Sequence, residues 1–257
     1  MKQRYTIACL ALCFLTLIIS NPLLAAPLKS YTEPATGIKF VLVPGGCFEM
    51  GNIHGGGSYT EYPAHDVCVD SFYIGTTEVT QGQWKALMET NPSSFKLGDN
   101  YPVETLSRKN ISQFAKKMEK KSDKGFRLPT EAEWEFACRS GGKEEKFCGS
   151  SHAKEVAWFQ TNAADTVHPV AEKKPNSLGL YDMSGNVWEL CSDIFSRDYY
   201  KNSPKQNPQG AETGRHYIKR GGSWDINENF QRASTRGRGS YDEKHYSTGF
   251  RLVFPAE

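Results

Sequence analysis

The chain lacks a marked excess of charge of either sign, since its 257 residues carry 31 Lys and Arg against 29 Asp and Glu. A nucleic-acid-binding protein usually shows a basic excess or a basic stripe, so no nucleic-acid partner is expected. No repeat is present, which excludes collagen and coiled coils. Aromatic residues make up 12% of the chain, which is too many for a long disordered protein. With no linker and no second composition block, the sequence predicts one folded domain.

Long apolar runs are absent except near the start of the chain. Two basic residues precede an almost wholly apolar stretch at 7–20, and small residues follow at Ala25 and Ala26. This layout is typical of a secretory signal peptide, and the apolar run is short for a membrane span of about 20 residues. An uncleaved N-terminal anchor is the alternative. We expect an exported, periplasmic or secreted protein with no membrane span after cleavage. Its expected parts are a signal peptide at 1–25, an N-terminal extension at 26–36 and a domain at 37–257.

Cysteines are few once the signal peptide is removed, and five are left: Cys47, Cys68, Cys138, Cys148 and Cys191. An oxidising compartment allows disulfides, and an odd number leaves at least one thiol unpaired or bonded to another molecule. Cys47–Cys68 is the preferred pair, because both flank apolar strand-like runs. Cys138 pairs with Cys148 or with Cys191, and the sequence does not choose. No C-x-x-C or H-x-x-x-H spacing exists, so zinc is not expected.

Regular structure is indicated mainly in the first half of the chain. Two short strands are predicted within 37–50 and one alternating strand at 67–74. Three helices are predicted to begin after capping residues, which are Thr80, Ser107 and Thr130.

The second half has little periodicity and is rich in Gly, Asn, Asp, Ser and Tyr. Strands are indicated only at 220–224 and 249–254. The sequence therefore predicts an α+β domain with few regular elements, of the kind that carries function on its loops.

Four groups of residues carry a resemblance to a known family. They are residues 40–51 with EVT at 78–80, RLPTEAEWEFACR at 127–139, NSLGLYDMSGNVWELCSD at 176–193, and RGGSW at 220–224 with a final GFR at 249–251. In this order they resemble the sulfatase-modifying-factor, or formylglycine-generating-enzyme, family. The resemblance implies a single loop-rich domain of C-type-lectin-like topology, with a few short helices and short antiparallel strands.

The resemblance also implies a structural calcium ion in the 182–189 turn. Asp182 and Glu189 would supply side-chain oxygens, and Gly185 and Val187 would supply backbone carbonyls. Such hard oxygen donors are the ligands that Ca²⁺ takes. The residues alone allow another interpretation, an Asx-type turn in which Glu189 forms a salt bridge with an arginine.

The catalytic centre of the family is not conserved in this chain. The family's copper-dependent oxidases follow the RGGS string with two cysteines five residues apart, whose thiolates bind Cu(I). The corresponding positions hold Ile226 and Gln231, and no cysteine follows Cys191. Copper is therefore not expected, and the sequence leaves open whether the protein is an enzyme.

A cleft without copper chemistry is still indicated. Ser223 and Trp188 match positions that line the family's active-site groove, and Ser247 stands where the family has an asparagine. Arg232 and Arg236 belong to a polar segment that could grip a peptide, a sugar or a small acid. The alternative is a surface loop laced with salt bridges. No catalytic role is assigned to any of these residues.

Three functions are compatible with these features. The resemblance implies an exported maturation or tailoring factor that acts on a peptide or peptide-derived substrate, as in the periplasmic branch of the family that matures a siderophore chromophore. The first alternative is a non-catalytic lectin-like module that binds a protein or a glycan. The second is a formylglycine-generating oxidase with atypical ligands.

Overall fold

The computed structural model describes residue 1 and residues 29–256. Apart from its first residue, the predicted signal peptide at 1–25 lies outside the described residues. In the described part of the chain, no helix is long and apolar enough to cross a membrane. The described helices are α1 (Gln81–Met88), α2 (Arg108–Ser122), α3 (Glu131–Cys138) and α4 (Ala153–Val156), with 3-10 turns at Tyr59–Glu61, Tyr199–Lys201 and Glu228–Gln231.

The three longest helices begin where their capping residues predict. The side chains of Thr80, Ser107 and Thr130 each accept a hydrogen bond from the backbone N–H three residues later. The side-chain oxygen of that third residue accepts a hydrogen bond from the backbone N–H of the cap, which completes a capping box. These local interactions need no tertiary contact, and they explain why the helix starts could be read from the sequence.

In the part of the chain that the structure describes, ten short strands form three sheets. The strands are β1 (Ser30–Thr32), β2 (Lys39–Val43), β3 (Gly46–Met50), β4 (His65–Val69), β5 (Phe72–Gly75), β6 (Trp188–Ile194), β7 (His216–Arg220), β8 (Gly237–Ser240), β9 (Thr248–Gly249) and β10 (Val253–Pro255). One sheet has the order β1-β2-β5-β10, a second pairs β3 with β4, and the third has the order β8-β7-β6-β9. All pairs are antiparallel except β6 with β9. The expected single α+β domain is thus confirmed.

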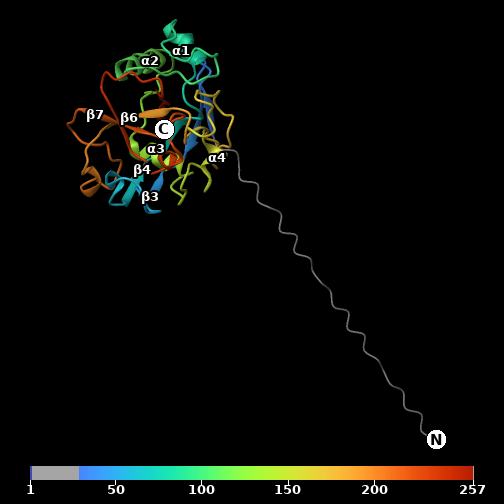
Figure 1. The fold of residues 1–257 in the computed structure, drawn as a ribbon, viewed down its shortest axis with the longest axis vertical. Coiled ribbons are helices and arrows are strands. Elements are labelled where there is room, and N and C mark those ends of the chain that lie inside the picture. Colours follow the sequence, from blue (N-terminus) through green and yellow to red (C-terminus); the bar gives the residue numbers. More distant parts are fainter. Residues whose placement is uncertain (2–28, 257) are drawn as a thin grey trace.

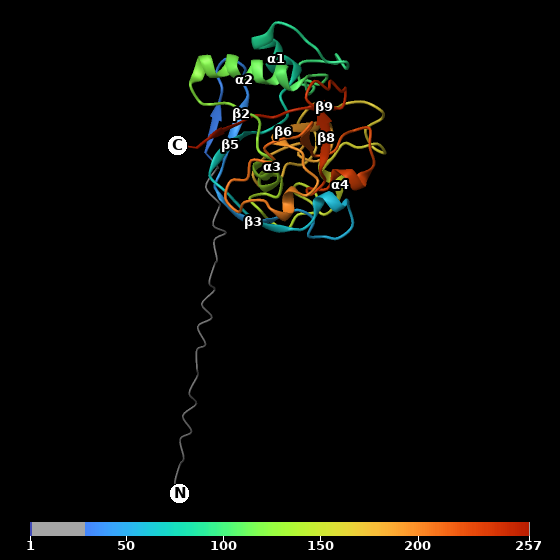
Figure 2. The same cartoon turned by 90° about the vertical axis from the view of Figure 1, so that its left-hand side faces the viewer.

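Helices α1 and α2 lie together at one end of the molecule, and β3 lies at the opposite end (Figures 1 and 2). The buried stripe of α2 faces one apolar core, which it shares with α1 and with Phe40, Phe250 and Phe254. A second core lies around α3, β3 and β4. The third sheet is built from strands within the loop-rich residues after 142.

Three strand predictions need correction. The predicted strand at 67–74 is two strands, because the chain turns after β4 and enters a different sheet as β5. The strand predicted at 220–224 ends at Arg220, because two glycines with positive φ follow it. The strand predicted at 249–254 is divided between β9 and β10. In each case a turn outweighs the apolar pattern.

Residues 29–36, the described part of the predicted extension at 26–36, include a strand of the first sheet. This strand, β1, pairs with β2, with Tyr31 opposite Phe40. The ring of Tyr31 also meets Phe254 edge to face at 5.5 Å. The folded domain therefore includes the described residues before 37.

Two disulfides connect four of the five cysteines outside the predicted signal peptide. Cys47 and Cys68 are bonded across the β3–β4 pair, which confirms the preferred pairing. Cys138 is bonded to Cys148, and among the described residues Cys191 is the free cysteine, fully buried. Disulfides are typical of oxidising compartments, so both bonds are consistent with an extracytoplasmic protein.

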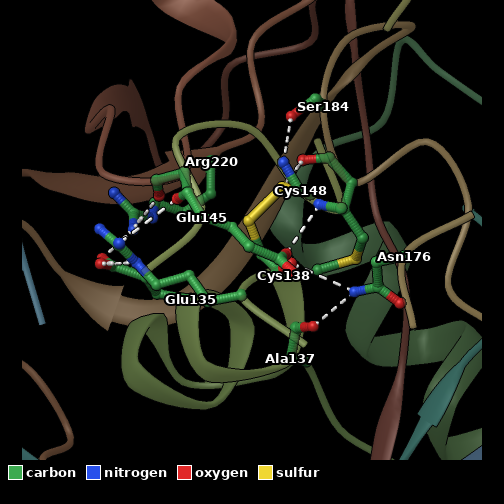
Figure 3. The surroundings of a disulfide bond; sticks show 12 residues. Glu135, Ala137, Cys138, Glu145, Cys148, Asn176, Ser184 and Arg220 are labelled. Carbon is green, nitrogen blue, oxygen red and sulfur yellow. Dashed lines mark hydrogen bonds and ion pairs between the residues drawn. A yellow bond between two sulfur atoms is a disulfide. The ribbon is translucent and has the colours of Figure 1, made fainter. Parts of the chain in front are cut away.

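The second disulfide fixes the end of α3 against two later segments (Figure 3). The side-chain amide of Asn176 donates hydrogen bonds to the carbonyl oxygens of Ala137 at 2.7 Å and Cys138 at 3.1 Å. The backbone N–H of Cys148 donates to the hydroxyl of Ser184 at 3.2 Å. These bonds position the 182–189 turn relative to α3.

Candidate functional site

The loop after β7 contains Ile226 and Gln231, the two positions that the family resemblance assigns to copper ligands. Gln231 is fully buried at the end of a 3-10 turn. Its side-chain amide donates hydrogen bonds to the carbonyl oxygens of Ser223, Ile226 and Asn227 at 3.2, 3.4 and 3.2 Å. The amide therefore stabilises the conformation of the loop. Neither an amide nor the alkyl group of Ile226 is the soft sulfur donor that Cu(I) prefers.

Two glycines make this arrangement possible. Gly221 and Gly222 have φ values of +95° and +79°. A Cβ on Gly222 would lie 2.2 Å from Oε1 of Gln231 and 2.7 Å from the carbonyl oxygen of Phe230. The next residue, Ser223, is buried, and its hydroxyl donates to Oδ1 of Asp225 at 2.5 Å. Ser223 thus has a structural role in the described conformation.

Both arginines of the predicted cleft wall are engaged in buried ion pairs. Arg232 donates from both terminal nitrogens to the carboxylate of Glu61 at 2.6 and 2.9 Å. Arg236 donates to both oxygens of Glu131 at 2.7 and 2.8 Å. Burial raises the pKa of Glu131, but the charges of Arg236 and Arg220 outweigh burial and hold it below its usual range. Bidentate pairs of this kind are geometrically specific. Of the two interpretations of this segment, the one with internal salt bridges therefore describes Arg232 and Arg236.

The other two predicted groove residues lie together at the start of β6. The backbone N–H of Trp188 donates to the carbonyl oxygen of Ser247 at 2.8 Å. The hydroxyl of Ser247 lies 2.8 Å from Nδ1 of His245. Both Trp188 and Ser247 are buried, and neither lines the largest cavity described next.

The largest described cavity, of about 730 Å³, lies between the Gly-rich loop at 54–58 and the segment at 227–236. Arg232 and Arg236 form part of its wall, and Phe230 is 47% exposed beside it. The sequence analysis identified the arginines but assigned no site to the loop. Three consecutive glycines at 55–57 were the available signal, because such a run allows close approach of a ligand to the backbone.

The predicted calcium turn belongs to an acidic cluster, defined here as Glu78, Asp182 and Glu189. All three are buried around the guanidinium of Arg251. Arg251 donates to both oxygens of Glu189 at 2.6 and 2.7 Å, and the indole N–H of Trp134 donates to the same carboxylate at 2.8 Å. Glu189 therefore forms the arginine salt bridge that the residues alone allowed.

The other two carboxyl groups of the acidic cluster are incompletely satisfied. Asp182 accepts one hydrogen bond, from the backbone N–H of Ala171 at 2.7 Å, and its Oδ1 has no partner. Both side-chain oxygens of Glu78 are buried without a partner. Burial is the main cause that raises the pKa of Asp182 to about 6 and the pKa of Glu78 well above its usual value. In the sequence, Glu78 is notable only as part of the EVT string at 78–80, so its place beside the turn was not predicted.

The donor set fits a calcium ion in part. Asp182 has a free oxygen, and Glu78 adds two free oxygens beside it, whereas the oxygens of Glu189 are occupied by Arg251 and Trp134. Within residues 29–256, no group of three or more His, Cys, Asp or Glu side chains is placed to hold a metal ion. Calcium binding at this turn therefore stays a prediction.

Comparison with known proteins identifies the family. Residues 27–256 match the family described as the sulfatase-modifying factor enzyme 1-like domain. The chain is 31% identical to the chaperone protein LppX of Paenibacillus barcinonensis, over 83% of this chain and 88% of that protein. It is 28% identical to the formylglycine-generating enzyme of Streptomyces coelicolor, over 92% of this chain and 96% of the enzyme.

Among solved structures, the chain is similar to Treponema denticola variable protein 1. The TM-score is 0.82 at 27% identity, and the match covers 90% of this chain and all of the other. The family match spans every strand and helix of the described fold. This chain belongs to the sulfatase-modifying factor enzyme 1-like family and has the fold of the formylglycine-generating enzymes.

Proposed function

We propose that the protein acts outside the cytoplasm as a maturation or tailoring factor that binds a peptide or peptide-derived substrate without copper–thiolate chemistry. The observation that carries this proposal is the role of Gln231. Its buried amide bonds to three backbone carbonyls of the loop in which the related oxidases place a thiolate. At this position the loop has an amide that stabilises its backbone, where the resemblance implies a reactive thiolate in the oxidases.

The available sulfur chemistry supports the same proposal. In residues 29–256 four cysteines are bonded in pairs, and the remaining thiol, Cys191, is fully buried. Burial raises the pKa of that thiol well above its usual value, which disfavours the thiolate that would bind Cu(I). Relatives named as formylglycine-generating enzymes and as a chaperone support a protein or peptide as the substrate.

A non-catalytic binding module for a protein or a glycan is the second candidate. The observation that favours it is the satisfied state of the candidate polar groups. Arg232, Arg236 and Ser223 are all engaged within the protein. Residues held in this way make a rigid wall that can contact a ligand, whereas acid–base catalysis needs a group free to exchange a proton.

Copper affinity and peptide oxidation test the proposal together. The purified protein is titrated against a Cu(I) chelator and is then incubated with oxygen and a cysteine-containing sulfatase-motif peptide. The Streptomyces coelicolor formylglycine-generating enzyme serves as the positive control. We expect neither tight Cu(I) binding nor aldehyde formation. Tight binding with peptide oxidation would refute the proposal and indicate a formylglycine-generating oxidase with atypical ligands.

Turnover separates the two candidates that survive that result. Extracts from the periplasm or culture medium are incubated with the protein, and peptides are compared by mass spectrometry with and without it. A mass change that requires the protein supports a tailoring factor. Retention of an unchanged ligand supports the binding module.

We also propose that calcium binds at the 182–189 turn. Asp182, with the carbonyls of Gly185 and Val187, would hold the ion, which would offset the excess negative charge of the acidic cluster. The unpartnered oxygens of Asp182 and Glu78 support this proposal. Unfolding measured at pH 7 with calcium and with chelator tests this proposal.

A further inference from the structure

The wall of the cavity between 54–58 and 227–236 contains several hydrogen-bond donors that have no acceptor among residues 29–256. Gly55, Gly56 and Gly57 line the cavity, and their backbone N–H groups make no hydrogen bond in the described part of the chain. All three residues have positive φ, between +71° and +84°. Consecutive unpaired N–H groups in such a turn can bind an anion by donating hydrogen bonds to it.

Side chains add to this excess of donors. Lys146 lines the cavity and has no carboxylate partner among the described residues. The hydroxyl of Thr235 is buried in the same wall with no hydrogen-bond partner. A buried polar group without a partner costs free energy, so a ligand that accepts a hydrogen bond there is stabilised.

The carboxylate in the cavity wall already has hydrogen-bond partners within the protein. Glu61 is the one carboxylate in the wall. Its oxygens accept from Arg232, from the hydroxyl of Ser234 and from the backbone N–H of Ser58. Burial raises the pKa of Glu61, but the Arg232 hydrogen bond and the other partners hold it below its usual range. The wall therefore offers unpaired positive charge and no unpaired negative charge.

The cavity also has an apolar contact surface. Phe230 lies in the wall and is 47% exposed. The backbone of Phe230 is held in place because the next residue, Gln231, is buried and its side-chain amide bonds to the carbonyl oxygen of Ser223. An exposed aromatic ring on a rigid turn is a suitable surface for an apolar side chain of a ligand.

We propose that this cavity binds the carboxylate of a peptide, with an apolar side chain of the same peptide packed on Phe230. The carboxylate accepts hydrogen bonds from the 55–57 backbone and lies near the ammonium group of Lys146. The peptide class rests on the proposed function, whereas the preference for a carboxylate rests on the cavity alone. A C-terminal carboxylate and an acidic side chain supply the same chemistry.

Three matched probes distinguish these two sources. They are acetyl-Gly-Phe with a free carboxylate, its C-terminal amide, and acetyl-Asp-Phe amide, which carries only a side-chain carboxylate. Each is titrated into ¹⁵N-labelled protein and followed by backbone amide chemical shifts. We expect at least one carboxylate probe to shift resonances of 54–58 and 227–236. The neutral amide should bind about tenfold more weakly, since it lacks the charge-assisted hydrogen bonds.

Variants localise the effect. Lys146→Gln should weaken the carboxylate probe by about fivefold, the upper range for an exposed ion pair. Lys143→Gln is the matched control, because Lys143 is exposed three residues away, bonds to Ser177 and does not line the cavity. It should leave binding unchanged.

Several outcomes would overturn the carboxylate site. These are equal binding of the acid and the amide, shifts confined to other residues, no effect of Lys146→Gln, or no binding of any probe at millimolar concentration. Charge-independent peptide binding would leave the proposed function standing and remove only this inference. Copper-dependent oxidation of a peptide would do the reverse.

Discussion

Replacing Asp182 with asparagine should change how stability depends on pH. The carboxyl group is 2% exposed and shares its surroundings with two other carboxylates and one arginine. Burial, with the negative charge of Glu189, raises its pKa from 3.8 to about 6. The folded protein therefore holds this proton more tightly than the unfolded chain does.

The sign and the size of the effect follow from this difference. Stabilisation from a carboxyl whose folded pKa is raised is fully present below the unfolded value, and it is lost as pH rises through the folded value. At 1.36 kcal/mol per pKa unit, a rise from 3.8 to about 6 corresponds to about 3 kcal/mol. The Asp182→Asn variant has no proton to lose. Relative to the wild type, it should gain about 3 kcal/mol of stability between pH 4 and pH 8.

Urea unfolding at several pH values, with both disulfides intact, measures this difference. Asp193 has a pKa raised by burial to about 7, but it is present in both proteins and cancels in the comparison. Asp66→Asn is the control, because the side chain of Asp66 is 74% exposed. Parallel stability profiles for the wild type and Asp182→Asn would refute the reasoning. The experiment is done in chelator to keep calcium away from Asp182.

Adding calcium at pH 7 extends the experiment to the proposed metal site. An ion that binds only the folded state stabilises it by about 2.7 kcal/mol at 100 times its dissociation constant. The wild type should gain this stability, and the Asp182→Asn variant should gain much less. A wild-type unfolding midpoint that is indifferent to both calcium and chelator would contradict the calcium proposal.

Two further substitutions test the loop and the first disulfide. Gly222→Ala places a Cβ 2.2 Å from Oε1 of Gln231 at a φ of +79°. It should therefore destabilise the protein by at least about 2 kcal/mol in urea unfolding. A change below about 0.5 kcal/mol would contradict the role of the Gln231 amide in holding the loop. Cys47→Ser should free Cys68 to alkylation and lower stability by about 3 kcal/mol, given a sequence separation of 21; a Cys68 that stays unreactive in denaturant would contradict the pairing.

The features that the sequence predicted well are local. Each helix start depends on a cap and a partner three residues later, so Thr80, Ser107 and Thr130 could be recognised without the fold. The first disulfide joins residues that face each other in neighbouring strands. The strand limits were less accurate, because turns at Gly221 and after β4 interrupt apolar patterns that continue through them.

The features that the sequence missed are contacts between distant residues. Arg232 and Glu61 are separated by 171 positions, and Arg251 and Glu189 by 62. No spacing rule connects such pairs, so a cluster of arginines could be interpreted either as a ligand grip or as a salt-bridged wall. The same limit hid the cavity, whose two sides come from 54–58 and 227–236.

Loss of the copper thiolates changes what the loop after β7 can do. A thiolate pair has to remain accessible to metal and substrate, whereas the buried amide of Gln231 bonds to three carbonyls and fixes the same backbone. Phe230, next to it in the chain, is then held in a defined position beside the cavity. Because a preorganised surface loses less entropy when it binds, the fixed loop supports the proposal that this site recognises a ligand. We therefore expect a binding function here even without copper ligands.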